Sequence, residues 1–185
     1  MKKICVLLAN GFEEVEAFSA IDLLRRAGIL VDTISISNYN TAVGGAHHIT
    51  VIADKTFEEA NYSEYDGIVI PGGQPGVTNL RGDEPTKRVI KYFANNDKLV
   101  GAICAAPLVL FDCGLLKDRT FTCFPGVEKE ITEGNHKTDE VVVDGNLVTS
   151  RGVGTAIAFA LKLIEKILNK DKADEIATQI VFKKR

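Results

Sequence analysis

The sequence predicts an α/β protein with a single, mainly parallel sheet that is covered by helices on both faces. Short apolar segments rich in Val and Ile alternate with longer amphipathic segments along the chain of 185 residues. This alternation is typical of strands joined by crossover helices. Polar or glycine-rich sequence follows directly on three of the apolar segments. Since ligands bind at the carboxyl ends of the strands in such sheets, we expect the functional site at these three points.

The composition fits one globular domain, residues 1–185, and argues against several classes of function. Hydrophobic residues make up 45% of the chain and charged residues 25%, which is ordinary for a soluble domain. The net charge of -3, with scattered Lys and Arg, argues against a nucleic-acid partner. We interpret the terminal Lys183-Lys184-Arg185 as a solvated end. No apolar run is long enough to cross a bilayer, and the segment after Met1 predicts a first strand and not a signal peptide. We therefore expect a cytoplasmic protein without a membrane partner.

Apolar runs and their end signals predict the elements of the first 113 residues. Val15 and the apolar residues on the following turns are expected to face the core from the first helix, and Gly28 ends that helix. The glycine pair Gly44-Gly45 breaks the chain before a short strand. The expected strands are Lys3–Leu8, Leu30–Ser37, Ile49–Ala53, Tyr65–Pro71 and Leu99–Ile103, and the expected helices are Glu13–Ala27, Pro85–Asn95 and Ala105–Cys113.

The rest of the chain is less regular, but a hairpin and two helices stand out. Residues 141–149 alternate around Asp144-Gly145-Asn146, which is a turn signal between two strands. A long amphipathic helix follows at Gly154–Leu168, and a shorter helix at Lys172–Gln179 closes the chain. Between the two halves, Thr120–Cys123 predicts a short strand and Val127–Glu133 a helical segment.

The four cysteines are Cys5, Cys104, Cys113 and Cys123. None forms a C-x-x-C pair, so we expect neither a zinc site nor a thioredoxin-type site, and we predict no metal. In a reducing compartment all four are expected to be free thiols. Each cysteine therefore either packs in the core as a structural residue or serves as a reactive thiol.

Cys104 is the best candidate for a reactive thiol. The apolar strand Leu99–Ile103 runs straight into this cysteine and then into small residues and a helix, which is the arrangement of a nucleophile elbow. The bend of such an elbow is often strained. A helix that starts at Ala105 would favour the thiolate through its free amide groups and its dipole, which predicts a lowered pKa. The alternative is a buried structural cysteine.

The other two strand ends offer backbone amides and carboxylates. Gly72 and Gly73 follow Pro71 and allow close approach of the backbone to a ligand, so the N–H groups of Gly73 and Ala105 are candidates for an oxyanion site. A plain turn explains Pro-Gly-Gly equally well. Asn10 and three glutamates follow the first strand. Periodicity alone favours a solvated Glu16; a buried Glu16 would have a raised pKa and act as a general acid or base.

The three histidines are His47, His48 and His136. Each is consistent with a surface position, and the sequence places none of them beside Cys104. A Cys–His dyad is therefore not predicted.

Five segments, in order along nearly the whole chain, resemble the ThiJ/PfpI superfamily and, within it, the branch of the parkinsonism-associated protein deglycase. They are Asn10-Gly11-Phe12-Glu13-Glu14-Val15-Glu16, Asp22-Leu23-Leu24-Arg25-Arg26-Ala27-Gly28, Pro71-Gly72-Gly73, Ala102-Ile103-Cys104-Ala105-Ala106-Pro107 and Thr149-Ser150-Arg151-Gly152.

The resemblance implies a flavodoxin-like three-layer sandwich related to class I glutamine amidotransferases. It implies a nucleophile at Cys104, a protonated partner at Glu16 and oxyanion amides at Gly73 and Ala105, with Gly72 and Asn10 beside them. It also implies a homodimer through the helix Glu13–Ala27. In the relatives a basic residue of one subunit approaches the cysteine pocket of the other, and His47 stands at the matching position here. His47 would therefore face Arg26 or the pocket of the other subunit.

The implied activity is removal of reactive 2-oxoaldehydes or of their adducts on proteins, without a cofactor. An oxidative-stress sensor or chaperone-like protein that acts by oxidation of Cys104 is the alternative, and a catalytically silent scaffold is a third interpretation. A thiamine-biosynthesis role has little support. Two departures from the family pattern matter. Ala105 stands where peptidase-like members have His, which argues against a peptidase, and Phe124 stands where deglycase-like members often have His, which leaves Glu16 as the main acid/base candidate.

Overall fold

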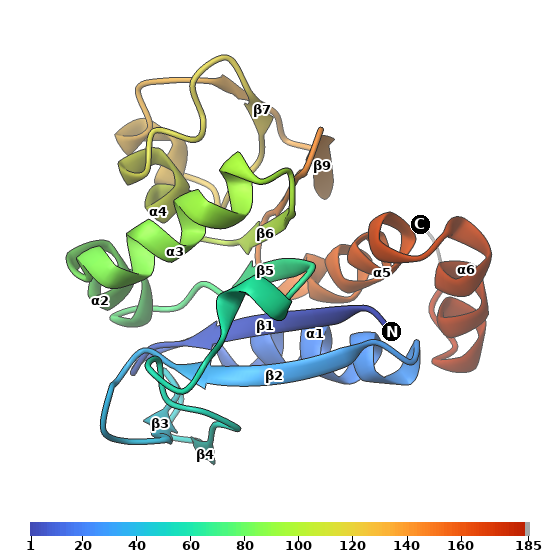
Figure 1. Cartoon of the computed structure of the whole chain (residues 1–185). Coiled ribbons are helices and arrows are strands. Elements are labelled where there is room, and N and C mark those ends of the chain that lie inside the picture. Colours follow the sequence, from blue (N-terminus) through green and yellow to red (C-terminus); the bar gives the residue numbers. More distant parts are fainter. Residues whose placement is uncertain (184–185) are drawn as a thin grey trace.

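The computed structural model describes residues 1–183 and has a central six-stranded sheet (Figure 1). The strand order is β2-β1-β5-β6-β10-β9. All neighbouring pairs are parallel except β10 and β9, which form the predicted hairpin. The strands are β1 (Lys3–Leu8), β2 (Leu30–Ser35), β5 (Gly67–Ile70), β6 (Leu99–Ile103), β9 (Val141–Asp144) and β10 (Leu147–Ser150). The predicted α/β class with a mainly parallel sheet is confirmed.

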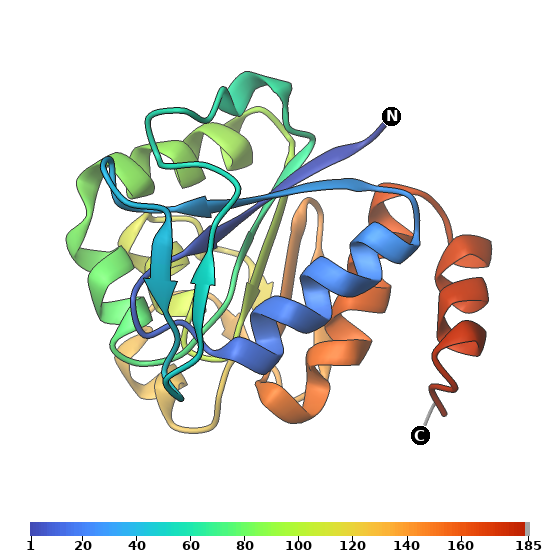
Figure 2. The ribbon, with the colours of Figure 1, turned by 90° about the horizontal axis from the view of Figure 1, so that it is seen from below.

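Helices cover both faces of this sheet, which gives three layers (Figures 1 and 2). Alternate residues of β1 separate the two cores: Ile4, Val6 and Leu8 pack on one side, and Cys5 and Leu7 on the other. This is the two-residue period of a strand buried on both faces. The first side is covered by α1 (Glu14–Arg26) and α5 (Ala156–Ile167), with α6 (Lys170–Gln179) against α5; the second is covered by α2 (Gly76–Gly82), α3 (Glu84–Asn95) and α4 (Pro107–Asp112).

Several smaller elements lie outside the main sheet and the helices that cover it. Two short pairs lie outside the main sheet: β3 (Ala42–Gly44) with β4 (Thr50–Ile52), and β7 (Thr120–Phe121) with β8 (Asn135–His136). Three 3₁₀ turns complete the assignment: η1 (Tyr62–Glu64), η2 (Val127–Glu130) and η3 (Val153–Thr155). No helix in residues 1–183 combines the length and apolar character needed to cross a membrane.

Several predicted boundaries are corrected by the structure. The segment Val127–Glu133 is not a full helix, because only the 3₁₀ turn η2 forms there. His136, which was consistent with a surface position, ends the short strand β8 and is partly buried. The elements β3 and α2 were not predicted, because both consist of short, glycine-containing sequence without a clear period. The last two residues, Lys184 and Arg185, lie outside the described part of the chain.

The expected orientation of α1 holds for Ile21 and Leu24, which are buried, but it is wrong at Val15. Val15 is 48% exposed, whereas Glu16 is 1% exposed. The buried face of the helix includes Ala20 and Leu24, which follow Glu16 at intervals of four residues. Glu16 therefore enters the protein with the core residues and is not solvated.

Candidate functional site

Cys104 lies on a tight bend at the carboxyl end of β6. Its φ is 66°, in the left-handed region that is strained for a residue with a side chain. Both backbone groups are held: the N–H donates to Ser150 O at 3.0 Å, and the C=O accepts from Phe124 N at 2.9 Å. The predicted tight bend is confirmed, and so is a helix after it, but α4 is shorter than predicted, because it begins only at Pro107 and has six residues. Helix α4 therefore cannot supply the predicted dipole effect at Cys104.

Glycines at the end of β5 let three segments meet. A Cβ on Gly72 would lie 2.6 Å from Cys104 Cβ and 2.8 Å from Glu16 Oε2. Gly73 has a φ of 93°, and a Cβ there would lie 2.4 Å from the backbone nitrogen of Glu13. Both positions thus exclude a side chain for a steric reason. The backbone N–H groups of Gly73 and Ala105 point at the Cys104 sulfur and lower its pKa in part.

Glu16 brings a carboxyl group against the thiol from α1. Its Oε2 accepts a hydrogen bond from Gly72 N at 2.8 Å, and the carboxyl group interacts with the Cys104 thiol. Its Oε1 is buried and has no hydrogen-bond partner among the described residues. Gly152, which follows β10, lies close by, since a Cβ on Gly152 would be 3.8 Å from Glu16 Oε1. The structure thus brings Cys104, Glu16, Gly72, Gly73 and Ala105 together.

The electrostatics of the pair differ from the prediction. Burial raises the pKa of Glu16 to about 7, and the nearby charge of Glu13 adds to the effect. Burial and the Glu16 carboxylate raise the pKa of Cys104 to about 12, so the predicted lowered pKa is wrong for this state of the pair. The reason is that two negative charges in one desolvated site are unfavourable. A thiolate arises here when the remaining proton moves from Cys104 to Glu16, because that transfer removes the like charge.

Glu13 is a site residue that the sequence reasoning missed. Its Oε2 caps α1 by accepting from Glu16 N at 2.8 Å, and its own N–H donates to Gly72 O at 2.9 Å. It therefore fixes the start of α1 against the glycine turn. Acidic residues at the start of a helix are favoured by the helix dipole, and this weaker signal was available in the sequence.

Three predicted site residues make their contacts elsewhere. Asn10 Oδ1 accepts from Gly44 N at 2.9 Å and connects the first loop to β3. His47 Nδ1 lies 2.8 Å from Glu14 Oε2, and this contact raises the pKa of His47. Arg26 forms an ion pair with Asp22, at 2.7 Å. None of these contacts involves Cys104, so their roles at the site remain predictions.

The thiols differ in access, and this predicts an order of alkylation. Cys104 is half-buried, whereas Cys5, Cys113 and Cys123 are buried. Burial raises the pKa of all four thiols, so access and not pKa distinguishes Cys104. We expect iodoacetamide to label Cys104 first, since it reaches solvent and can pass its proton to Glu16, and to label Cys5 last. Peptide mapping at partial modification checks this order. Faster labelling of any other cysteine would contradict it.

Gly72→Ala is expected to lower activity without unfolding the chain. The new methyl group displaces Cys104 or Glu16, whose atoms lie 2.6 and 2.8 Å from its position, and a misplacement of about 1 Å costs up to about 100-fold in turnover. Gly82→Ala is the matched control, because nothing lies within 4 Å of its Cβ position. The measurement is kcat/KM for a 2-oxoaldehyde, with circular dichroism as a check on folding. An equal loss of kcat/KM in both variants would show that crowding at Gly72 is not the cause.

Comparison with known proteins places this site in a family. The sequence profile described as the DJ-1/PfpI family matches residues 2–166. Protein dj-1beta of Drosophila melanogaster is 35% identical over 178 residues, which cover 95% of each chain. A Schizosaccharomyces pombe protein named glutathione-independent glyoxalase DJ-1 is 31% identical over 185 residues, with coverage of 95% of this chain and 96% of the relative. Protein DJ-1 homolog B of Arabidopsis thaliana is 38% identical over 95% of this chain, which spans only 40% of that longer protein.

Solved structures agree. A DJ-1 superfamily protein from Salmonella typhimurium, crystallised as a cysteine-to-alanine mutant, has a TM-score of 0.95 at 36% identity, and both chains are covered completely. The oxidized form of Toxoplasma gondii DJ-1 gives the same TM-score, identity and coverage. Because the family profile matches residues 2–166 and full-length relatives are more than 30% identical, this chain belongs to the DJ-1/PfpI family.

Proposed function

We propose that this protein converts small 2-oxoaldehydes such as methylglyoxal into 2-hydroxy acids, with Cys104 as the nucleophile and Glu16 as the acid/base group. One observation carries the proposal: a buried carboxyl group with a pKa raised to about 7 lies against a half-exposed thiol at a strained bend. A pKa near neutrality is what proton transfer at physiological pH requires. The S. pombe relative, named a glutathione-independent glyoxalase, supports the same activity.

The first step uses the shared proton of the pair. Cys104 transfers its proton to Glu16, and the thiolate attacks the aldehyde carbon, forming a C–S bond while the C=O electron pair moves to the oxygen. The N–H groups of Gly73 and Ala105 already point at the sulfur, so an oxygen on the attacked carbon lies within their reach. Proton return from Glu16 to that oxygen gives the hemithioacetal.

The second step moves a proton within the bound substrate. Glu16 takes the proton from the former aldehyde carbon and returns it to the neighbouring ketone carbon. The proton of the hemithioacetal hydroxyl passes to the ketone oxygen, so that the carbon bound to sulfur becomes the C=O of a thioester and its neighbour carries the hydroxyl group. Water then attacks the thioester, the C–S bond breaks and the Cys104 thiol is restored. The sum is 2-oxoaldehyde plus water to 2-hydroxy acid, so no external oxidant or reductant is consumed. Adducts of the same aldehydes on protein side chains are the second substrate class of this proposal.

The test is turnover by the purified chain alone. We expect methylglyoxal to disappear and lactate to form in equal amounts, followed by proton nuclear magnetic resonance, with a chelator present and glutathione absent. Loss of methylglyoxal without lactate would show that the protein only forms adducts. No loss above buffer would contradict the proposal.

Oxidation of Cys104 is a second candidate function, supported by the unpartnered Glu16 Oε1. A sulfinic group on Cys104 would supply acceptor oxygens to the N–H groups of Gly73 and Ala105 and to a protonated Glu16. A relative of similar fold has been crystallised in an oxidized form. Peptide mass spectrometry after graded peroxide treatment tests this candidate: oxidation of Cys104 at doses that leave the other three thiols unmodified is expected.

We also propose a homodimer that works in the cytoplasm, with α1 at the interface. Ala20 and Ile21 of this helix are buried within the chain and offer no surface to a partner. What remains on α1 is the exposed Val15 and the partly buried Phe18. Light scattering at low micromolar concentration is expected to give twice the mass of one chain, and a monomer mass would refute the dimer.

A further inference from the structure

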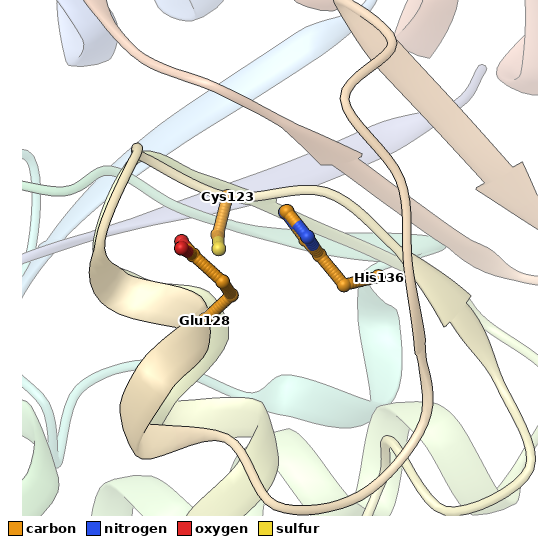
Figure 3. Close-up of side chains that lie close together, drawn as sticks. All are labelled: Cys123, Glu128 and His136. Atoms are coloured by element: carbon orange, nitrogen blue, oxygen red, sulfur yellow. The ribbon is translucent and has the colours of Figure 1, made fainter.

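A second group of reactive side chains lies in the β7–β8 region, apart from the Cys104–Glu16 pair. Cys123 follows β7, Glu128 lies in η2 and His136 ends β8. One ligand atom from each lies within 4.8 Å of the other two. Figure 3 shows the thiol, the carboxylate and the imidazole ring turned toward a common space.

The backbone of three elements holds this group in place. Register pairing of β7 with β8 puts His136 opposite Phe121, two residues before Cys123. Gly126 N donates to Glu128 Oε2 at 2.7 Å, which orients the carboxylate and leaves its other oxygen available. The backbone N–H of Glu128 is directed at the Cys123 sulfur. The side chains are therefore positioned by structure and do not meet by chance at a flexible surface.

His136 carries the observation that points to a ligand. Its Nε2 is buried and has no hydrogen-bond partner among the described residues. A buried imidazole nitrogen without a partner is unfavourable unless something binds it. Cys123 is fully buried and Glu128 is half-buried, so bulk solvent does not freely supply a hydrogen-bond partner for His136 Nε2.

We propose that Cys123, Glu128 and His136 bind one thiophilic divalent cation of the Zn²⁺ class. A thiolate, an imidazole and a carboxylate are the donor types that zinc takes, whereas Mg²⁺ and Ca²⁺ select oxygen ligands. Zinc–ligand distances of about 2.0–2.3 Å place tetrahedral ligand atoms about 3.5 Å apart. Side-chain rotations that move each ligand atom by roughly 1 Å therefore bring the three atoms to the distances that zinc requires. Water takes the fourth position. This metal is distinct from the reaction at Cys104, which needs none.

Charge favours the same conclusion. A Cys123 thiolate and the Glu128 carboxylate together neutralise a divalent cation, and binding releases the thiol proton to solvent. Arg151 is the cation that acts on Cys123, and its guanidinium is engaged by Thr138 O at 2.8 Å. The other mixed cluster, Glu13 with Glu14 and His47, differs because His47 is already hydrogen-bonded to Glu14 and is largely exposed.

The experiment is a titration of the chelator-treated, reduced full chain with ZnCl₂ alone, by calorimetry, and with CoCl₂, by absorption. All variants are made on a Cys104→Ala background, so that the active-site thiol cannot be the ligand. We expect one equivalent of Zn²⁺ to bind and the Co²⁺ form to show a thiolate-to-cobalt charge-transfer band. His136→Gln and Cys123→Ser should each weaken binding by about 100-fold or more, since even an outer-shell partner is worth about 10–100-fold.

Matched controls separate this site from the alternatives. Cys113→Ser removes another buried thiol, and His47→Ala removes the imidazole of the other cluster; both should bind zinc as the parent does. If Cys123→Ser does not fold, His136→Gln decides, and its folding is checked by near-ultraviolet circular dichroism. Binding that survives His136→Gln, or that disappears in His47→Ala, would overturn the assignment. So would a parent protein that takes up no Zn²⁺ or a cobalt form without the charge-transfer band.

Discussion

Replacement of Cys104 by Ala is expected to lower methylglyoxal turnover by at least about 10⁴-fold, since removal of a nucleophile costs up to about 10⁶-fold in kcat. The variant has no atom that can form the C–S bond, while Glu16 and the glycine turn remain. Folding should be retained, because Cys104 is only half-buried and its backbone bonds to Ser150 and Phe124 do not involve the side chain. Initial rates of lactate formation measure the effect.

Cys113→Ala is the control for this experiment. It removes a thiol that is 6% exposed and lies in the core beneath α3 and α4, so turnover per folded molecule should stay within a few-fold of wild type. A Cys104→Ala protein that keeps substantial turnover would rule out covalent catalysis at this cysteine.

Replacement of Glu16 by Gln is expected to lower turnover by about 10²–10⁴-fold, the usual contribution of a general acid/base. Gln keeps the acceptor for Gly72 N but cannot carry a proton between substrate atoms. In wild type, kcat/KM should rise with pH through about 7, because below the raised pKa of Glu16 both groups of the pair are protonated and no thiolate forms. A Gln variant with wild-type turnover, or with the same rise at pH 7, would remove Glu16 from the mechanism.

The same variant has an expected effect on stability, with a definite sign. The pKa of Glu16 is raised from 4.5 to about 7 in the folded chain, so its contribution to stability is full below about pH 4.5 and is lost as pH rises through about 7. Because Gln has no such titration, the free energy of unfolding of wild type relative to Gln should fall between pH 5 and 8, by on the order of 3 kcal/mol at most. Urea denaturation at the two pH values measures the difference, in which all shared titrations cancel.

The sequence was sufficient for the sheet and for the cysteine bend. Runs such as Leu99–Ile103 carry their own strand signal, and small residues around Cys104 predicted a tight turn that the φ of 66° confirms. The hairpin of β9 and β10 was predictable because Asp144-Gly145-Asn146 is a strong local turn signal. These features depend on residues close together in the chain.

Features that depend on tertiary contacts were not predictable. The burial of Glu16 follows from how α1 packs on α5, and apolar Val15 pointed to the opposite face. The raised pKa of Cys104 arises because Glu16, from a distant helix, shares its desolvated site. The group of Cys123, Glu128 and His136 has no sequence motif, since its members come from three elements that meet only in the folded chain.

The central claim is a covalent bond between the Cys104 sulfur and the aldehyde carbon of the substrate. Acid quenching of the reaction during turnover, followed by intact and peptide mass spectrometry, tests it most directly. The account predicts a mass increase of one methylglyoxal on the peptide that contains Cys104. An active protein that shows no adduct on Cys104, or carries it on another cysteine, would contradict the account.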